Sequence, residues 1–142
     1  MKNYLRWIPL IFSLFLIFGL TLQSGSASKQ LTENTQSAIN SMVNSQAETN
    51  WWDDYTLMRN LGHVPEYLLL GLSSVMAFRK WWKAGILCVA ISFLDEIIKG
   101  ILPGREFDFV DMRFDFAGYV IGIATMLTIL EIRKRKEHNT NG

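Results

Sequence analysis

The sequence predicts an all-α protein in which four helices cross a membrane as an up-down-up-down bundle. Three observations lead to this fold class. The 142-residue chain is 49% hydrophobic, and most of its apolar residues are gathered in four runs. Basic residues flank these runs on one predicted side, and acidic residues interrupt or border them on the other. We therefore expect a single membrane domain over residues 1–142, with a soluble helical bundle as the alternative.

The four spans are expected at about residues 5–22, 63–79, 82–102 and 111–131. The first contains sixteen uncharged residues, Trp7–Leu22, close to the length of about 20 that crosses the hydrocarbon. The second begins near Pro65, because a first helical turn tolerates a residue that lacks an N–H. The third breaks at Pro103 and Gly104, and the fourth is uncharged from Phe116 to Leu130.

The first span has a second interpretation. Lys2 and Arg6 precede its apolar core, and Ser26-Ala27-Ser28 follows, which is also the pattern of a cleaved secretory signal. The length of the core and its flanking Trp7 favour a span that is retained.

Residues 23–62 form the long polar segment of the chain and are expected to be an external loop. Apolar residues recur within it at rough helical spacing, at Leu31, Ile39, Met42 and Val43. A short helix on the outer surface and a flexible loop both fit this pattern. Residues 132–142 are expected to be a cytoplasmic tail.

The basic residues set the orientation of the bundle. With both termini inside, the cytoplasmic segments hold nine of the fourteen basic residues and only two of the thirteen acidic ones. Cytoplasmic loops of membrane proteins carry this excess of lysine and arginine. The sequence therefore predicts a multi-pass protein of the cell membrane with its N- and C-termini in the cytoplasm. The basic tail is interpreted as a topology anchor, and no nucleic-acid partner is expected.

Polar faces recur near the predicted outer ends of three spans. They comprise His63, Glu66 and Tyr67; Asp95 and Lys99, with Glu96 about 100° away; and Asp108, Asp111 and Asp115. An unpaired charge facing acyl chains is costly, so such faces turn toward the bundle interior. We expect them to meet in one pocket.

Three interpretations of this pocket compete, with a channel or proton path as a fourth. In the first, the charges only neutralise one another: Asp95 or Glu96 with Lys99, Arg105 with Asp111, and Arg113 with Asp115. In the second, a ligand is bound by His63, Glu66, Tyr67, Asp95, Glu96, Arg105, Asp111 and Asp115. In the third, His63, Glu66, Asp95 and Glu96 act as acid–base groups or hold a divalent metal. Oxygen ligands with one histidine suit Mg²⁺, Mn²⁺ or Ca²⁺ better than structural Zn²⁺.

The fourth span contains Gly118 and Gly122, spaced so that another helix can approach closely. This spacing indicates either packing inside the bundle or dimerisation, and the former is favoured.

Several of these segments, in this order, resemble the VanZ-like family of small membrane proteins. The matching segments are Gln23-Ser24-Gly25, Arg59 to Tyr67, Asp95-Glu96, Leu102 to Arg105, Asp111 to Gly118, and Gly122. The resemblance implies a four-helix membrane bundle and a link to low-level resistance to the glycopeptide teicoplanin. This chain departs from the family pattern at Lys99, where the family usually has glutamine. A lysine there could neutralise Asp95 or Glu96, which disfavours a metal at the site.

These observations predict a membrane protein whose outward-facing pocket binds a cell-envelope component, either lipid-linked or a glycopeptide. The alternative is a membrane-embedded hydrolase or transferase of a lipid-linked substrate, with Glu66 or Glu96 as general base. No cofactor is predicted. If the site held one, it would be a divalent metal ion, since the sequence offers ligands for no other kind.

Overall fold

The computed structural model describes residues 4–22, 25–43, 54–103 and 108–140. Within these ranges the chain is helical, without strands. Its elements are a 3-10 turn η1 (Leu5–Trp7) and the helices α1 (Ile8–Thr21), α2 (Gly25–Val43), α3 (Tyr55–Phe78), α4 (Trp81–Ile101) and α5 (Phe109–Thr140).

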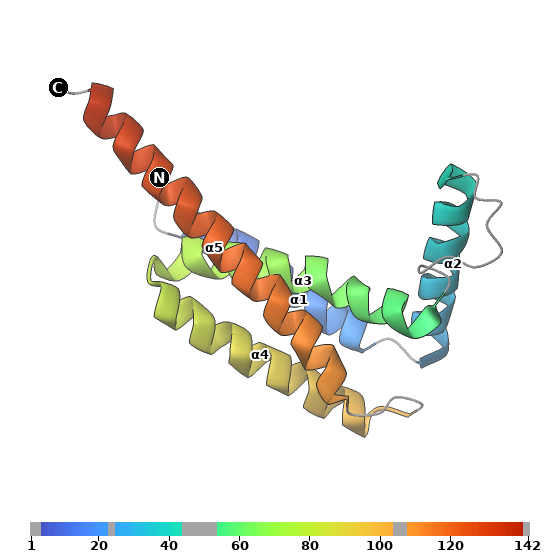
Figure 1. The fold of residues 1–142 in the computed structure, drawn as a ribbon. Coiled ribbons are helices and arrows are strands. Elements are labelled where there is room, and N and C mark those ends of the chain that lie inside the picture. The colour runs from blue at the N-terminus through green and yellow to red at the C-terminus, as the bar shows by residue number, and fades with distance from the viewer. Residues whose placement is uncertain (1–3, 23–24, 44–53, 104–107, 141–142) are drawn as a thin grey trace.

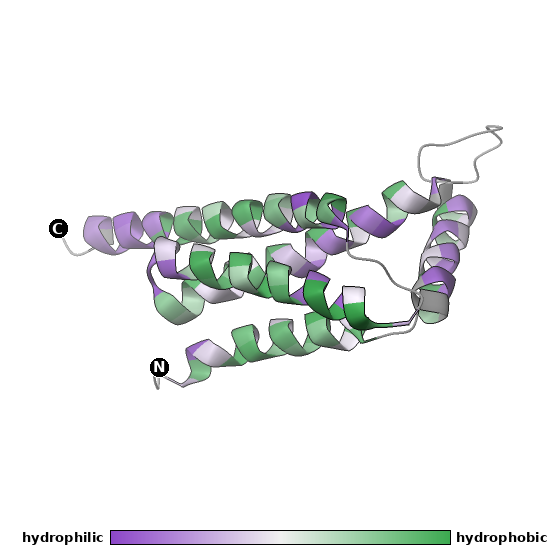
Figure 2. Cartoon of the chain, turned by 90° about the horizontal axis from the view of Figure 1, so that it is seen from below, coloured by the Kyte–Doolittle hydropathy of each residue, from purple (hydrophilic) through white to green (hydrophobic). Residues whose placement is uncertain are grey.

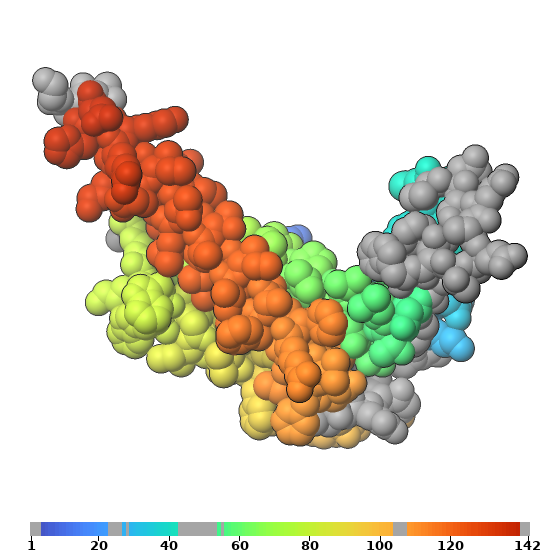
Figure 3. Space-filling view, viewed as in Figure 1, coloured from blue at the N-terminus to red at the C-terminus, as the bar shows by residue number. Residues whose placement is uncertain are grey.

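Helices α1, α3, α4 and α5 lie side by side, and α2 stands across one end of them (Figure 1). Consecutive members of this group run in opposite directions, so the start of α1 and the end of α5 lie at the end away from α2 (Figure 2). Helix α3 is central and packs against α1, α4 and α5. The C-terminal part of α5 projects from the bundle beyond the other helices (Figure 3).

Glycines allow α3 and α5 to approach closely. A Cβ added at Gly71 would lie 2.5 Å from the backbone oxygen of Tyr119, and one added at Gly118 would lie 2.5 Å from that of Val64. A Cβ at Gly122 would collide with the backbone oxygen of Leu68. The Gly-x-x-x-Gly spacing therefore serves packing inside the bundle, and the contact fixes how α3 and α5 face each other.

The helix bounds correct two details of the sequence analysis. Helix α3 begins at Tyr55, about eight residues before the expected start of the second span, because Asp54 accepts hydrogen bonds from the backbone N–H groups of Thr56 and Leu57 (2.9 and 3.2 Å). Pro65 consequently lies inside the helix and not in its first turn. The expected loop over residues 23–62 contains the nineteen-residue helix α2, which favours the surface-helix interpretation.

The distribution of side chains is the reverse of that in a water-soluble domain. Thirteen polar or charged residues are buried among the described part of the chain, against ten hydrophobic ones. Large apolar side chains such as Phe15, Phe93 and Phe116 are at least half exposed. Green, hydrophobic residues accordingly cover much of the bundle helices in Figure 2. Soluble proteins bury charged groups rarely, whereas a bundle surrounded by lipid presents apolar residues outward.

Two of the described helices are long and apolar enough to cross a membrane, over Thr56–Phe78 and Phe109–Asn139. The apolar stretch Leu5–Thr21 is shorter than these two. Helix α4 carries the three charged residues Asp95, Glu96 and Lys99 near its C-terminal end, and these charges are why its composition does not select it as a span. Length and composition thus select two spans of the four expected, and the number four stays a prediction.

The glycine contacts make a prediction about stability. We expect Gly71→Ala to lower the thermal stability of the detergent-solubilised protein, although alanine in a helix is intrinsically better than glycine by about 1 kcal/mol. Gly85→Ala is the control, because a Cβ there would meet no atom within 4 Å. Unfolding followed by circular dichroism measures both. Equal or higher stability of Gly71→Ala than of Gly85→Ala would show that α3 and α5 are not closely packed.

Candidate functional site

Lys99 lies at the centre of a cluster of buried carboxylates. Its ammonium nitrogen is 2.8 Å from Asp95 Oδ2 and 2.6 Å from Glu96 Oε1, both on its own helix α4. The same nitrogen is 3.7 Å from Asp111 Oδ2 on α5. None of these four residues is more than 4% exposed. Asp95 and Glu96 precede Lys99 by four and three residues on α4, and this helical spacing brings both carboxylates to Lys99.

His63 connects α3 to the same cluster. Its Nε2 lies 3.5 Å from the Lys99 nitrogen and 3.6 Å from Asp111 Oδ2. Its Nδ1 lies 3.3 Å from Asp115 Oδ1, yet neither of these two buried atoms has a hydrogen-bond partner. The other oxygen of Asp115 accepts a hydrogen bond of 2.6 Å from the Ser92 hydroxyl on α4.

Further contacts join the cluster to the ends of the neighbouring helices. Arg59, one turn before His63 on α3, lies 3.4 Å from Asp111 Oδ1 and 3.7 Å from Asp108 Oδ2. The backbone N–H of Asp108 donates to Glu96 Oε2 at 3.0 Å. The Thr21 hydroxyl at the end of α1 donates to Asp95 Oδ1. All four bundle helices therefore contribute to the cluster.

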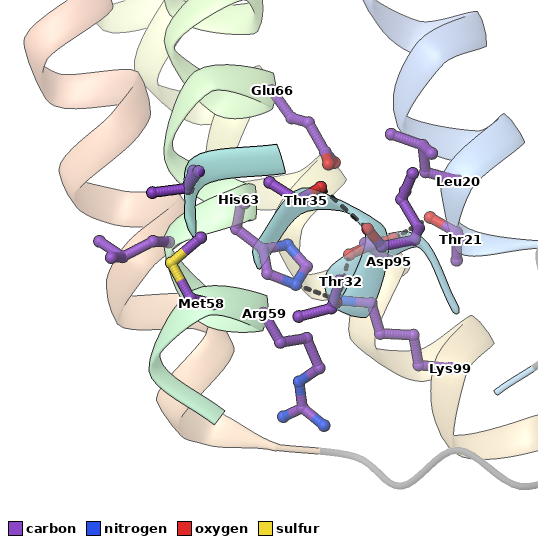
Figure 4. A pocket seen from close by; sticks show the side chains of 14 residues that line it. Leu20, Thr21, Thr32, Thr35, Met58, Arg59, His63, Glu66, Asp95 and Lys99 are labelled. Atoms are coloured by element: carbon purple, nitrogen blue, oxygen red, sulfur yellow. Dashed lines mark hydrogen bonds and ion pairs between the residues drawn. The ribbon is translucent and has the colours of Figure 1, made fainter. Parts of the chain in front are cut away.

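A cavity of about 330 Å³ opens beside these charges (Figure 4). Its charged lining consists of Arg59, His63, Glu66, Asp95 and Lys99, and its other lining residues are Leu20, Thr21, Leu31, Thr32, Thr35, Ile39, Met58, Leu61 and Gly62. Helix α2 supplies one wall of it, through residues 31–39. The volume lies at the lower end of the range for small-molecule sites. The cavity thus combines a charged floor with apolar walls.

Glu66 differs from the other carboxylates. It lines the cavity, only partly exposed, and it has no hydrogen-bond or ion-pair partner among the described residues. Pro65, directly before it, has no N–H to donate to the backbone oxygen of Leu61 one turn earlier. Leu61 also lines the cavity. Helix α3 therefore gives the cavity a carboxylate without a partner among the described residues, next to a point where the helix lacks one backbone hydrogen bond.

The structure brings together most of the residues that the sequence analysis selected. His63, Glu66 and Asp95 line the cavity, while Glu96, Asp111 and Asp115 lie behind them in the ion-pair cluster. Tyr67 is fully buried and does not line the cavity, and its hydroxyl has no partner among the described residues. Arg105 lies outside the described residues.

The expected pair of Arg113 with Asp115 does not form in the described part of the chain, and the expected pair of Arg105 with Asp111 lies outside it. Asp111 pairs with Arg59, Lys99 and His63. Asp115 faces His63 and Ser92, whereas Arg113 is exposed and has no ion pair among the described residues. Lys99 was expected to pair with Asp95 or Glu96, and it pairs with both.

Lys99 also affects whether a metal ion fits. His63, Asp95 and Asp115 each offer a ligand atom, all within 4.8 Å of one another. A divalent ion held by Asp95, however, would be next to the Lys99 ammonium, 2.8 Å from the same carboxylate. Because two cations repel strongly in a medium of low dielectric constant, the lysine takes the role that a metal would have.

Comparison with known proteins identifies the family. The family model for VanZ/LLP1 matches residues 6–130, which is most of the chain. The chain belongs to the VanZ/LLP1 family. The matched residues include all of the charged cluster and the cavity, and they stop before the exposed end of α5. A search of curated proteins and a search of solved structures find no match.

Sequence reasoning did not select three residues of this VanZ/LLP1 site. Arg59 precedes His63 by four residues and Glu66 by seven, so helical spacing would have revealed it had the helix been expected to begin before residue 63. Ser92 and Thr21 carry no comparable signal, because hydroxyl residues in apolar helices usually bond to their own backbone. Ser13 and Ser74 do so here, with Pro9 and Leu70.

The central position of Lys99 makes a second stability prediction. We expect Lys99→Met to lower the free energy of unfolding by about 3–5 kcal/mol, because it leaves buried carboxylates without their cation. Lys83→Met, near the exposed start of α4, is the control. Adding Glu96→Gln to Lys99→Met should restore part of the loss. Equal stability of Lys99→Met and Lys83→Met in detergent would show that the ammonium is not paired in the interior.

Proposed function

We propose that this chain is an integral membrane protein with four spans and with both termini in the cytoplasm. The reversed distribution of side chains supports the lipid environment, since it buries charge and exposes apolar residues. Helices α1 and α4 join α3 and α5 in the membrane, with their charged or hydroxyl residues turned inward. Helix α4 contacts both α3 and α5, which is consistent with this placement.

The distribution of charge along the bundle supports the orientation. Arg79, Lys80 and Lys83 lie at the turn between α3 and α4, at the same end as the basic residues 133–136 of α5. The cavity and α2 lie at the opposite end (Figures 1 and 2). Under the positive-inside rule the basic end is cytoplasmic, so the cavity faces outward.

We further propose that the cavity binds a component of the cell envelope, lipid-linked or a glycopeptide. The observation that carries this proposal is the joining of buried charges and apolar walls in one cavity at the predicted outer end. A lipid-linked molecule has this dual character, and so does teicoplanin, which carries an acyl chain. Teicoplanin is the drug to which the VanZ resemblance points. Binding at the bilayer surface would sequester the drug or change the accessible target, and Arg105 remains a predicted contributor.

The second candidate is a membrane-embedded hydrolase or transferase of a lipid-linked substrate. It is supported by Glu66, a carboxylate without an internal partner that is free to act as general base. Expressing cells would then contain a modified envelope lipid that is absent from cells with Glu66→Gln. A metal-dependent version is less favoured, because Lys99 already neutralises the carboxylates.

The orientation predicts the accessibility of single cysteines in intact cells. With Cys88 replaced by alanine, Gln36→Cys on α2 should react with a membrane-impermeant thiol reagent. Asn139→Cys near the end of α5 should react only after the cells are lysed. Reaction at residue 139 in intact cells would place the cavity in the cytoplasm and exclude an extracellular ligand.

The cavity predicts the effect of a bulky side chain at Gly62. This glycine lines the cavity, and a Cβ there would meet no atom within 4 Å. We expect Gly62→Phe to abolish any decrease in teicoplanin susceptibility that the parent confers, because the phenyl ring narrows the cavity without altering a charge. Gly19→Phe is the matched control, since Gly19 is exposed on α1 with the same free space.

The measurement is the minimal inhibitory concentration of teicoplanin at equal membrane expression of parent, both variants and empty vector. Equal values for the parent and the empty vector would refute the link to teicoplanin. Resistance of Gly62→Phe at the parental level would show that the cavity is not the site of action.

A further inference from the structure

Resting on the proposed function, we propose that the envelope component carries a positively charged amino group next to an apolar chain. In this arrangement the Glu66 carboxylate binds the amino group, and the apolar side chains of the cavity contact the chain. The inference goes beyond the binding of an envelope component, since it specifies the charge of the ligand.

The first support is the difference between satisfied and unsatisfied charges in the cavity. The cations are already engaged: Lys99 pairs with Asp95 and Glu96, and Arg59 pairs with Asp108 and Asp111. Glu66 alone among the charged lining residues has no hydrogen-bond or ion-pair partner among the described residues. An anionic ligand would have to compete with internal carboxylates for these cations, whereas a cationic ligand finds a free carboxylate.

The second support is the excess of acid. Six carboxylates of the described residues meet at this end of the bundle, from Glu66, Asp95, Glu96, Asp108, Asp111 and Asp115. In the part of the chain that the structure describes, the opposing cations are Arg59, Lys99 and, when protonated, His63. Even with His63 protonated, the cluster is negative when its carboxylates are ionised. Charges are poorly screened where water is excluded, so the potential in the cavity attracts a cation.

The third support comes from the acceptors around Glu66. The backbone oxygen of Leu61 lacks its helical donor because residue 65 is proline. An ammonium group has three N–H donors and no acceptor, so it can donate to the Glu66 carboxylate and to a backbone oxygen that proline leaves without its usual donor.

The apolar walls distinguish an organic amine from a bare metal cation. Leu20, Leu31, Ile39 and Met58, from three different helices, line the cavity together with Leu61. A hard cation would gain nothing from these side chains, and it prefers six or more oxygen ligands. An amine with an attached hydrocarbon chain uses both the acceptors and the walls.

The test uses three six-carbon probes with different charges, namely hexylammonium, 1-hexanol and hexanoate. Each is titrated into the full-length protein in nanodiscs, and saturable binding is measured by ligand-observed NMR. We expect hexylammonium to bind more tightly than the other two. Glu66→Gln should weaken the binding of hexylammonium by about tenfold or more, because the variant loses one charge-assisted hydrogen bond. The binding of 1-hexanol should not change. Glu131→Gln, an exposed glutamate on α5, should bind like the parent.

The outcomes separate this inference from the proposed function. Preference of the parent for hexanoate, or equal binding of hexylammonium by the parent and Glu66→Gln, would overturn the amine inference. In that case the binding of 1-hexanol and hexanoate is measured with Gly62→Phe. Loss of their binding in this variant would show that the cavity is a ligand site, although not one for amines. Absence of saturable hexylammonium binding to the parent would also overturn the amine inference. The teicoplanin measurement with Gly62→Phe decides the proposed function independently.

Discussion

The buried ion-pair cluster around Lys99 is the interaction on which the rest of this structure depends. A single ammonium contacts Asp95 and Glu96 on α4 and approaches Asp111 on α5. Through His63 the cluster reaches α3, the central helix. A carboxylate buried alone costs several kcal/mol, so these acids can occupy the interior only in each other's company and with their cation. The cluster therefore determines which helix ends meet and leaves the cavity beside them.

Much of this arrangement follows from one rule of membrane proteins. Because charged side chains cannot face acyl chains, polar faces on three apolar helices must turn toward one another, and they do so here. The exact partners do not follow from it. Asp111 is paired with Arg59, which the sequence analysis left in a loop because the N-cap at Asp54 was not recognised. Helical spacing predicted the faces, whereas pairing between helices depends on register that no local pattern specifies.

Helix α2 shows a second limit of sequence reasoning. Its apolar residues are sparse, and a flexible loop explained them equally well. In the structure, Leu31 and Ile39 face the cavity that the charged helices form. These two apolar residues therefore contact a cavity that other helices form, and no pattern within α2 itself indicates that contact. An outer helix of this kind also explains how a cavity with a charged floor acquires apolar walls.

An experimental structure of the protein in lipid nanodiscs, resolved well enough to show side chains, tests the central claim most directly. The account predicts the Lys99 nitrogen within hydrogen-bonding distance of both Asp95 and Glu96, in a bundle whose apolar helices lie in the lipid and whose cavity opens at the α2 end. A lysine directed away from these carboxylates, with a metal ion held between His63, Asp95 and Asp115, would contradict it.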